Sequence, residues 1–139
     1  MNDYRFSDLH IGLTHSFEET VTDEKMQLFL ELSGDSNPMH LDEQYAKAAG
    51  FRSRLVYGLL TSAFYSTLAG IYLPGKSCLL HGIDIKFQNP VYIGERLVIS
   101  GTVKELDERF KTLVIQAYIT NENGQKVSKA VIRAGVLDG

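Results

Sequence analysis

The sequence contains a single cysteine, Cys78, among its 139 residues. A lone cysteine leaves no partner for an internal disulfide and no cysteine-rich metal site, and it is typical of a reducing compartment, so we expect a cytoplasmic protein. Runs of Lys and Arg are also missing, and the formal net charge is -3. Because nucleic-acid binding normally requires a basic face, we expect no nucleic-acid partner.

Long uninterrupted apolar runs are absent as well. Residues 1–13 mix Asp3, Arg5 and Asp8 with apolar residues, which is unlike a secretory signal. Residues 55–73 are apolar but are interrupted by glycines and hydroxyl residues, which favours a core helix over a membrane span. The hydrophobic fraction of 44% and the charged fraction of 22% are typical of a soluble globular protein. The length suits one domain, which we expect to cover residues 1–139.

Helical periodicity dominates the first half of the sequence. Apolar residues occupy most sides of the last helical pattern, as in a helix that is buried. Gly34 is a plausible helix terminator, and the Asn37-Pro38 step cannot continue a helix, so we expect residues 35–40 to form a loop. The expected elements of this half are a strand at residues 15–21 and helices at residues 22 or 23 to 34, 42–49 and 58–71.

The second half alternates apolar and polar residues, the pattern of strands that are buried on one side. The Asn123-Gly124 step is a strong signal for a hairpin between the last two strands. Long strands joined by tight turns predict an antiparallel sheet, and a sheet with one buried helix predicts an α+β domain with the sheet curled around that helix. The expected strands are residues 79–88, 96–106, 110–120 and 126–137.

Two titratable residues in the expected loop are candidates for catalysis. Asp35 and His40 lie five residues apart in a segment shaped by Gly34 and Pro38. An aspartate and a neutral histidine can hold one water between them and exchange protons with it, which is general acid–base chemistry. On spacing alone, an Asx turn at Asp35 and a structural, half-buried His40 are the favoured interpretation.

Other candidates carry weaker signals. Gly58 opens the expected buried helix, where a backbone N–H and the helix dipole could stabilise an oxyanion, although on this feature alone a plain capping glycine is the favoured interpretation. Ser66 lies inside that helix and is more simply bonded to its own backbone than a nucleophile. The histidines lack metal-ligand spacing, and phosphate-binding and dinucleotide-binding glycine motifs are missing. We therefore expect neither a metal nor a cofactor.

The segment that contains Asp35 and His40 resembles the signature of a known family, the MaoC-like dehydratases and (R)-specific enoyl-CoA hydratases. The resemblance begins at an aromatic residue, Phe29, continues through Ser-Gly-Asp, Asn-Pro and His, and ends at Ala46. Residues 87–94 are similar to the family's Phe-x-x-Pro-Val-x-x-Gly strand pair, so the resemblance covers nearly the whole chain. A motif of this length outweighs the structural interpretation that spacing alone favours.

The resemblance implies the hot-dog fold and a reaction, the reversible syn addition of water to a trans-2-enoyl thioester that gives an (R)-3-hydroxyacyl thioester. It implies that Asp35 and His40 are the catalytic pair and that the N–H of Gly58 polarises the thioester oxygen. It implies an acyl-CoA or acyl-carrier-protein substrate and a homodimer or dimer-based oligomer. It also implies a set of substrate-binding residues, Asn37, Tyr57 and Ser66.

One departure from the family pattern lies beside the helix start. The family usually has histidine before the glycine, and this chain has Tyr57, which can donate a hydrogen bond but does not titrate near neutral pH. Tyr57 keeps a non-catalytic acyl-thioester-binding subunit as an alternative. A hot-dog thioesterase is the other alternative, and it is disfavoured because residues 51–82 contain no acidic side chain.

Overall fold

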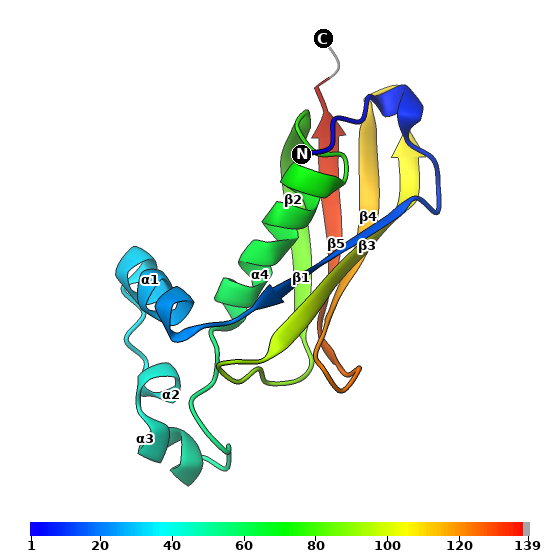
Figure 1. Ribbon diagram of the computed structural model, residues 1–139. Coiled ribbons are helices and arrows are strands. Elements are labelled where there is room, and N and C mark those ends of the chain that lie inside the picture. The colour runs from blue at the N-terminus through cyan, green and yellow to red at the C-terminus, as the bar shows by residue number, and fades with distance from the viewer. Residues whose placement is uncertain (138–139) are drawn as a thin grey trace.

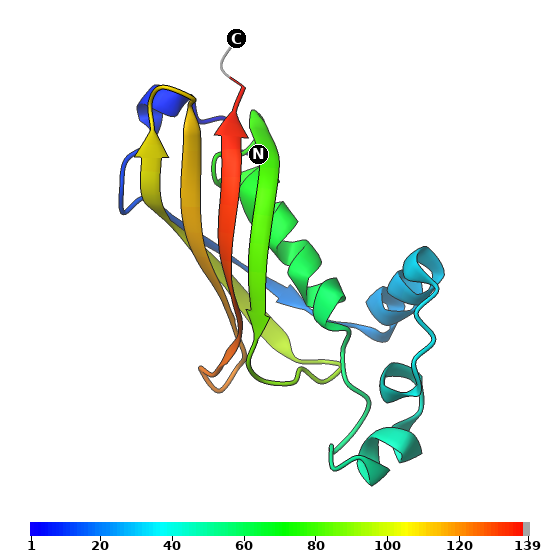
Figure 2. The same ribbon diagram turned by 180° about the vertical axis from the view of Figure 1, so that it is seen from behind.

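The computed structural model describes residues 1–137, and within them it confirms an α+β fold with a curled sheet around one helix (Figures 1 and 2). Five antiparallel strands form a single sheet in the order β1-β3-β4-β5-β2. The helix α4 lies along one face of this sheet, as in the hot-dog arrangement that the resemblance implies. The strands are β1 (Thr14–Thr20), β2 (Cys78–Phe87), β3 (Arg96–Asp107), β4 (Thr112–Thr120) and β5 (Lys126–Val136). The helical elements are η1 (Phe6–Asp8), α1 (Asp23–Ser33), α2 (Pro38–Leu41), α3 (Glu43–Ala48), α4 (Gly58–Thr67) and η2 (Leu68–Tyr72).

Three helices, α1 to α3, form an arm that projects beside the start of α4 (Figure 1). The Thr22 hydroxyl accepts a hydrogen bond from the Lys25 N–H and caps α1, and Gly34 ends that helix with a φ of 73°. Such a left-handed conformation is a common helix end that glycine adopts without strain. We call α1, α2 and α3 together the helical arm.

The expected loop at residues 35–40 is wrong in its second half, because α2 begins at Pro38. Proline cannot continue a helix, but it fits the first position of a new one, where its missing N–H costs no hydrogen bond. The Asn37 side chain accepts from the Met39 N–H and caps this new helix. His40 therefore lies on a helical turn, which restricts its position more than a loop would.

The helix α4 is anchored on the sheet by close packing, which fixes where its first residue lies. The buried hydroxyls of Tyr65 and Ser128, on α4 and β5, share a hydrogen bond of 2.8 Å. The expected helix at residues 58–71 is confirmed, and its last turn, η2, has π-helical bonding. A Cβ on Gly101 of β3 would lie 2.6 Å from the Leu68 Cδ2, so a larger residue there would displace the Leu68 side chain that packs on the sheet.

The four expected strands of the second half are confirmed to within two residues at each end. The side chains of β4 alternate strictly between buried and half-buried, and the buried ones face the core with α4. The hairpin between β4 and β5 turns at Asn121 and Gly124, where the Asn121 side chain accepts from the N–H groups of Asn123 and Gln125. Within residues 1–137, no helix combines the length and the apolar character needed to cross a bilayer.

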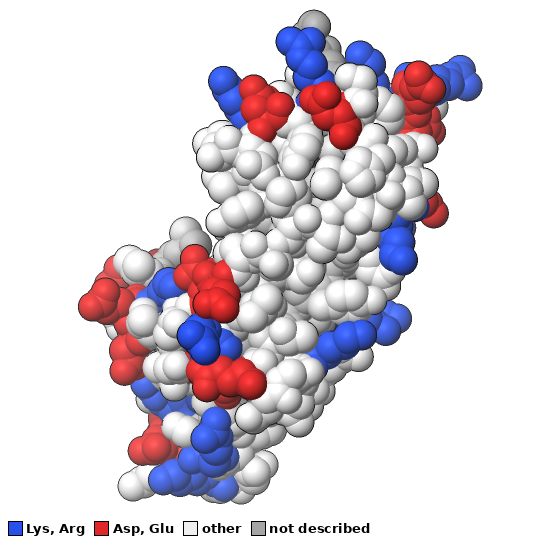
Figure 3. All heavy atoms as spheres, turned by 45° about the vertical axis from the view of Figure 1, so that its right-hand side comes forward, with Lys and Arg blue, Asp and Glu red and all other residues white. Residues whose placement is uncertain are grey.

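The expectation that α4 is buried on most sides is wrong for one stripe of the helix. Leu59 is 66% exposed, and Ala63 and Ser66 are exposed on the same side. The edge strand β2 pairs with β5 alone and adds exposed apolar side chains, including Leu79 and Ile83. Figure 3 shows a broad area without Lys, Arg, Asp or Glu, with charged side chains at both ends of the molecule and along its right-hand edge. The described subunit thus exposes apolar surface that the pattern of α4 assigns to the interior.

Candidate active site

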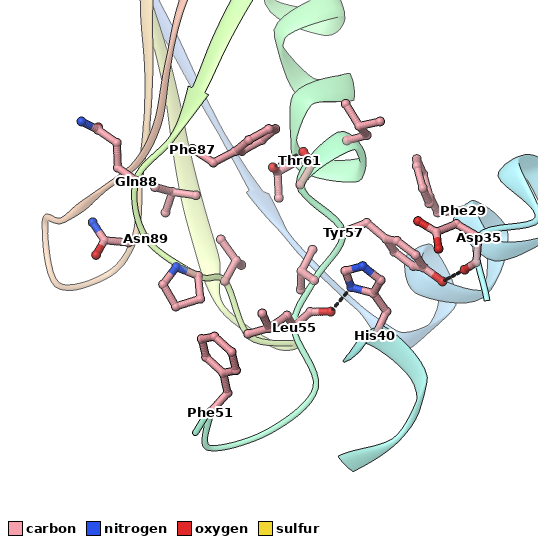
Figure 4. A pocket seen from close by; sticks show the side chains of 16 residues that line it. Phe29, Asp35, His40, Phe51, Leu55, Tyr57, Thr61, Phe87, Gln88 and Asn89 are labelled. Carbon is pink, nitrogen blue, oxygen red and sulfur yellow. Dashed lines mark hydrogen bonds between the residues drawn. The ribbon is translucent and has the colours of Figure 1, made fainter. Parts of the chain in front are cut away.

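A pocket of about 530 Å³ lies where the helical arm, the start of α4 and the end of β2 meet (Figure 4). Asp35 and His40 line it on the side of the helical arm. Its apolar wall comes from several segments that are far apart in the sequence, and it includes Phe29, Phe51, Leu59, Phe87, Val91 and Val127. Asp35 and His40 therefore face a largely apolar space, a common composition for a small-molecule site.

Asp35 lies directly after the glycine that ends α1. Its Oδ1 accepts the Asn37 N–H at 3.1 Å, and its own N–H donates to the Ser33 Oγ at 3.1 Å. This is the Asx turn that the sequence favoured as a structural role. The turn engages Oδ1 and leaves the side chain among the residues that line the pocket. The structural and catalytic interpretations of Asp35 are therefore compatible.

His40 is oriented by one backbone bond. Its Nδ1 lies 2.9 Å from the Leu55 carbonyl oxygen, as the dashed line in Figure 4 shows. A carbonyl oxygen can only accept, so Nδ1 carries the proton and the neutral ring presents Nε2 as an acceptor. The Leu55 N–H in turn donates to the Met39 carbonyl, which ties the segment before α4 to the helical arm. His40 is thereby placed as a base that can take a proton from water.

Gly58 is the first residue of α4 and lines the same pocket. The N–H groups of the first helical residues have no partner inside the helix, and the helix dipole favours negative charge at this end. A Cβ on Gly58 would lie 2.9 Å from the Phe87 Cε1, so a side chain here would displace the ring that covers the helix start. The arrangement can accept an oxygen on which negative charge develops.

Tyr57 contacts both Asp35 and His40. Its hydroxyl donates to the backbone carbonyl of Asp35 at 2.7 Å, and its ring stacks on His40 with centroids 4.1 Å apart. Burial raises the pKa of the Tyr57 hydroxyl, and the Asp35 carboxylate raises it further. In this structure the hydroxyl donates its proton to the protein backbone, and its role as a donor to substrate stays a prediction. The ring of Tyr57 does line the pocket.

Two other predicted substrate-binding residues do not reach this pocket. The Asn37 side chain caps α2 through the Met39 N–H at 2.9 Å, and Ser66 lies on the exposed stripe of α4. Neither belongs to the pocket lining found in residues 1–137. In the same residues, no three His, Cys, Asp or Glu side chains lie close enough together to form a metal site.

Sequence reasoning missed Leu55 and Arg54, which orient the site without carrying its chemistry. Leu55 acts through its backbone, for which side-chain identity gives no signal. Arg54 donates to Asp23 at 2.7 Å and approaches the His40 carbonyl at 3.5 Å, so it joins the helical arm to the segment before α4.

Comparison with known proteins agrees with this geometry. Residues 11–124 match the family described as the MaoC like domain, and the chain belongs to this family. It is 34% identical over 109 residues to an (R)-specific enoyl-CoA hydratase of Rhodospirillum rubrum, covering 77% of this chain and 76% of the relative. It is also 34% identical to a 3-hydroxybutyryl-CoA dehydratase of Methylorubrum extorquens, over 73% of this chain and 64% of that relative, less than two thirds of its length.

Among solved structures, the chain is similar to the R-hydratase PhaJ1 of Pseudomonas aeruginosa in the unliganded form. The two superpose with a TM-score of 0.90 at 26% sequence identity, covering 96% of this chain and 86% of the other. The curled sheet and single long helix described above are thus the hot-dog fold of the hydratases in this family.

Proposed function

We propose that this protein hydrates trans-2-enoyl thioesters to (R)-3-hydroxyacyl thioesters and catalyses the reverse dehydration. The observation that carries the proposal is the convergence of Asp35, His40 and the start of α4 at Gly58 on one largely apolar pocket. The named relatives support it, since they are an (R)-specific enoyl-CoA hydratase and a 3-hydroxybutyryl-CoA dehydratase. An apolar wall beside two proton-transferring groups suits an acyl chain whose reacting carbons lie near the thioester.

The chemistry follows from the groups that face the pocket. A water held between Asp35 and His40 adds its oxygen to C3 of the enoyl group, while its proton is taken up by the pair. Electrons from the double bond move toward the thioester oxygen, where the N–H groups at the start of α4 stabilise the negative charge. A proton returned to C2 from the same side completes the addition of one water molecule. Acid–base groups of this kind contribute about 10²–10⁴-fold to the rate.

A thioesterase is less well supported by the same geometry. The hot-dog thioesterase considered from the sequence would use a carboxylate near the central helix, and residues 51–82, which include α4, contain none. Asp35 is the carboxylate among the residues found to line the pocket, and it comes from the helical arm. Its neighbour His40 supports proton transfer to and from water held between the two side chains.

An assay of crotonyl-CoA hydration tests the proposal, with the loss of enoyl absorbance as the readout. We expect turnover without added metal or cofactor, and we expect the product to be the (R)-3-hydroxy enantiomer on chiral analysis. Parallel assays with crotonyl-carrier protein identify the thioester partner. Failure to hydrate either substrate, or formation of the (S) product, would contradict the proposal.

We also propose that two copies pair through the edge strand β2 and the exposed stripe of α4. A free strand edge favours pairing with another strand, and an antiparallel pair of identical strands satisfies twofold symmetry. Exposed apolar side chains of β2 on the side of the sheet that carries α4, including Leu80 and Ile83, give this face its hydrophobic character. A dimeric mass by light scattering, reduced to a monomeric mass by Ile83→Lys, is the expected outcome. A monomeric wild type at micromolar concentration would contradict it.

The cytoplasm remains the proposed location. The support is the single free cysteine, Cys78, because a lone thiol suits a reducing compartment. Partial burial raises the pKa of this thiol, which disfavours the reactive thiolate. Fractionation of cells that produce the untagged protein tests this, and recovery in a membrane or secreted fraction would contradict it.

A further inference from the structure

We propose that Tyr57 is a positioning residue, which keeps Asp35 and His40 in a fixed position relative to the start of α4. Its hydroxyl acts through bonds within the protein and not on the substrate. The kinetic consequences of this inference rest on the proposed hydratase function, and its structural consequences do not. Tyr57 occupies the position where the family pattern usually has histidine. Its contacts show what the tyrosine does there.

The first contact joins the start of α4 to the backbone of Asp35, in the segment between α1 and α2. Tyr57 caps α4, directly before Gly58, and its hydroxyl donates to the Asp35 carbonyl at 2.7 Å. Tyr57 is 2% exposed, whereas Asp35 is exposed, so a buried group restrains a residue that solvent would otherwise leave mobile. The bond therefore relates the carboxylate to the N–H groups at the start of α4.

The second contact restrains the histidine. The Tyr57 ring lies between Phe29 of α1 and His40 of α2, with centroid distances of 4.6 Å and 4.1 Å. Figure 4 shows the three rings together at the side of the pocket formed by the helical arm. Ring packing limits rotation of the imidazole about its bond to the Leu55 carbonyl, so Nε2 keeps its direction. One side chain thus contacts both members of the pair.

The chemistry of the phenol makes this restraint independent of pH near neutrality. Burial, followed by the Asp35 carboxylate, raises the pKa of the Tyr57 hydroxyl above its ordinary value of 10.0. The hydroxyl therefore remains a neutral donor throughout the range in which a histidine titrates. The positively charged Arg54 acts in the opposite direction and lowers the pKa, but burial is the larger effect.

Tyr57→Phe tests the inference, because it removes the hydroxyl and keeps the ring stack. Its matched control is Tyr65→Phe, which removes another buried tyrosine hydroxyl, bonded to Ser128, and neither Tyr65 nor Ser128 is among the residues found to line the pocket. Each variant is compared with wild type by amide hydrogen exchange across residues 34–40, by thermal unfolding, and by kcat and KM for crotonyl-CoA.

We expect Tyr57→Phe to accelerate amide exchange across residues 34–40 and to lower kcat by roughly two- to tenfold, the effect of one neutral hydrogen bond, with KM within about twofold of wild type. The pH profile of kcat between pH 5 and 8 should keep its shape, because no group that titrates there is lost. Tyr65→Phe should lower the thermal midpoint while leaving loop exchange and kcat unchanged.

Two results would overturn the inference. Unchanged exchange across residues 34–40 in Tyr57→Phe would show that the hydroxyl does not restrain the loop, and a rise in KM at constant kcat would show that Tyr57 binds substrate directly. If wild type hydrates no enoyl thioester, the proposed function fails, and the exchange measurement by itself decides whether Tyr57 positions the loop.

Discussion

Replacing Asp35 by asparagine removes the charge of the proposed acid–base pair while preserving the local fold. The Asp35 Oδ1 accepts the Asn37 N–H at 3.1 Å, and an asparagine amide oxygen can accept the same bond. The backbone contacts to Ser33 and Tyr57 do not involve the carboxylate. Because Asp35 is exposed, we expect the free energy of unfolding to change by no more than about 0.5 kcal/mol.

The effect on activity should be far larger than the effect on stability. Loss of one acid–base group lowers the rate by about 10²–10⁴-fold, and a hundredfold loss corresponds to about 2.7 kcal/mol of barrier height. Hydration of crotonyl-CoA at saturating substrate measures the loss, and urea unfolding of the same preparation measures the stability. Turnover within about threefold of wild type in Asp35→Asn would refute the role of the carboxylate. If the free energy of unfolding fell by as many kcal/mol as the activation barrier rose, the loss of activity would instead be explained by a damaged fold.

Three further outcomes follow from the contacts around the site and in the core. His40→Asn retains an N–H that can donate to the Leu55 carbonyl but lacks the acceptor Nε2, so crotonyl-CoA turnover should fall about 10²–10⁴-fold, and loss of the ring stack with Tyr57 should lower the free energy of unfolding by about 0.5–1.5 kcal/mol. Arg54→Ala removes the exposed pair with Asp23 and the long contact to His40, so urea unfolding should show a loss of up to about 1 kcal/mol, and turnover should fall roughly threefold. Burial raises the pKa of Tyr65 to about 12, so its hydroxyl contributes stability below pH 10 that is lost as pH rises through 12. Thermal unfolding of Tyr65→Phe should therefore depend less on pH between 10 and 12 than that of wild type.

The sequence predicted the sheet well because each strand carries its own signal. In β2 the apolar residues Ile83, Ile85 and Phe87 alternate with polar ones, and the Asn123-Gly124 step marks the hairpin between β4 and β5. Local residues alone determine such features, so they can be recognised without knowledge of the fold. The helix α2 was missed because a proline has two possible meanings in a sequence. Pro38 prevents an earlier helix from continuing, but it can also be the first residue of a new helix. The capping bond from the Met39 N–H to the Asn37 side chain decides for the new helix, and it is visible only in the structure.

The identities of the pocket-lining pair were predictable, whereas the way they are held was not. The motif places Asp35 and His40 in one short segment, and both line the pocket. The Tyr57 hydroxyl could have faced the substrate or the protein, and only the fold shows that it donates to the Asp35 carbonyl. Bonds to backbone oxygens leave no trace in side-chain patterns, because every residue carries a carbonyl.

The exposed stripe of α4 connects the candidate active-site pocket to the surface of the proposed dimer. Leu59 lines the pocket and is 66% exposed, and Phe87 at the end of β2 lines it and is 54% exposed. The apolar wall of the pocket is therefore continuous with the face that the edge strand leaves open. Water in contact with that wall weakens the electrostatic stabilisation of a developing oxyanion at Gly58. A second subunit seated on β2 would exclude this water, so pairing would support catalysis as well as stability. The turnover of wild type should accordingly fall in parallel with its dimer fraction as the protein is diluted, and Ile83→Lys, which places a charge on this face outside the pocket lining, should turn over slowly at every concentration.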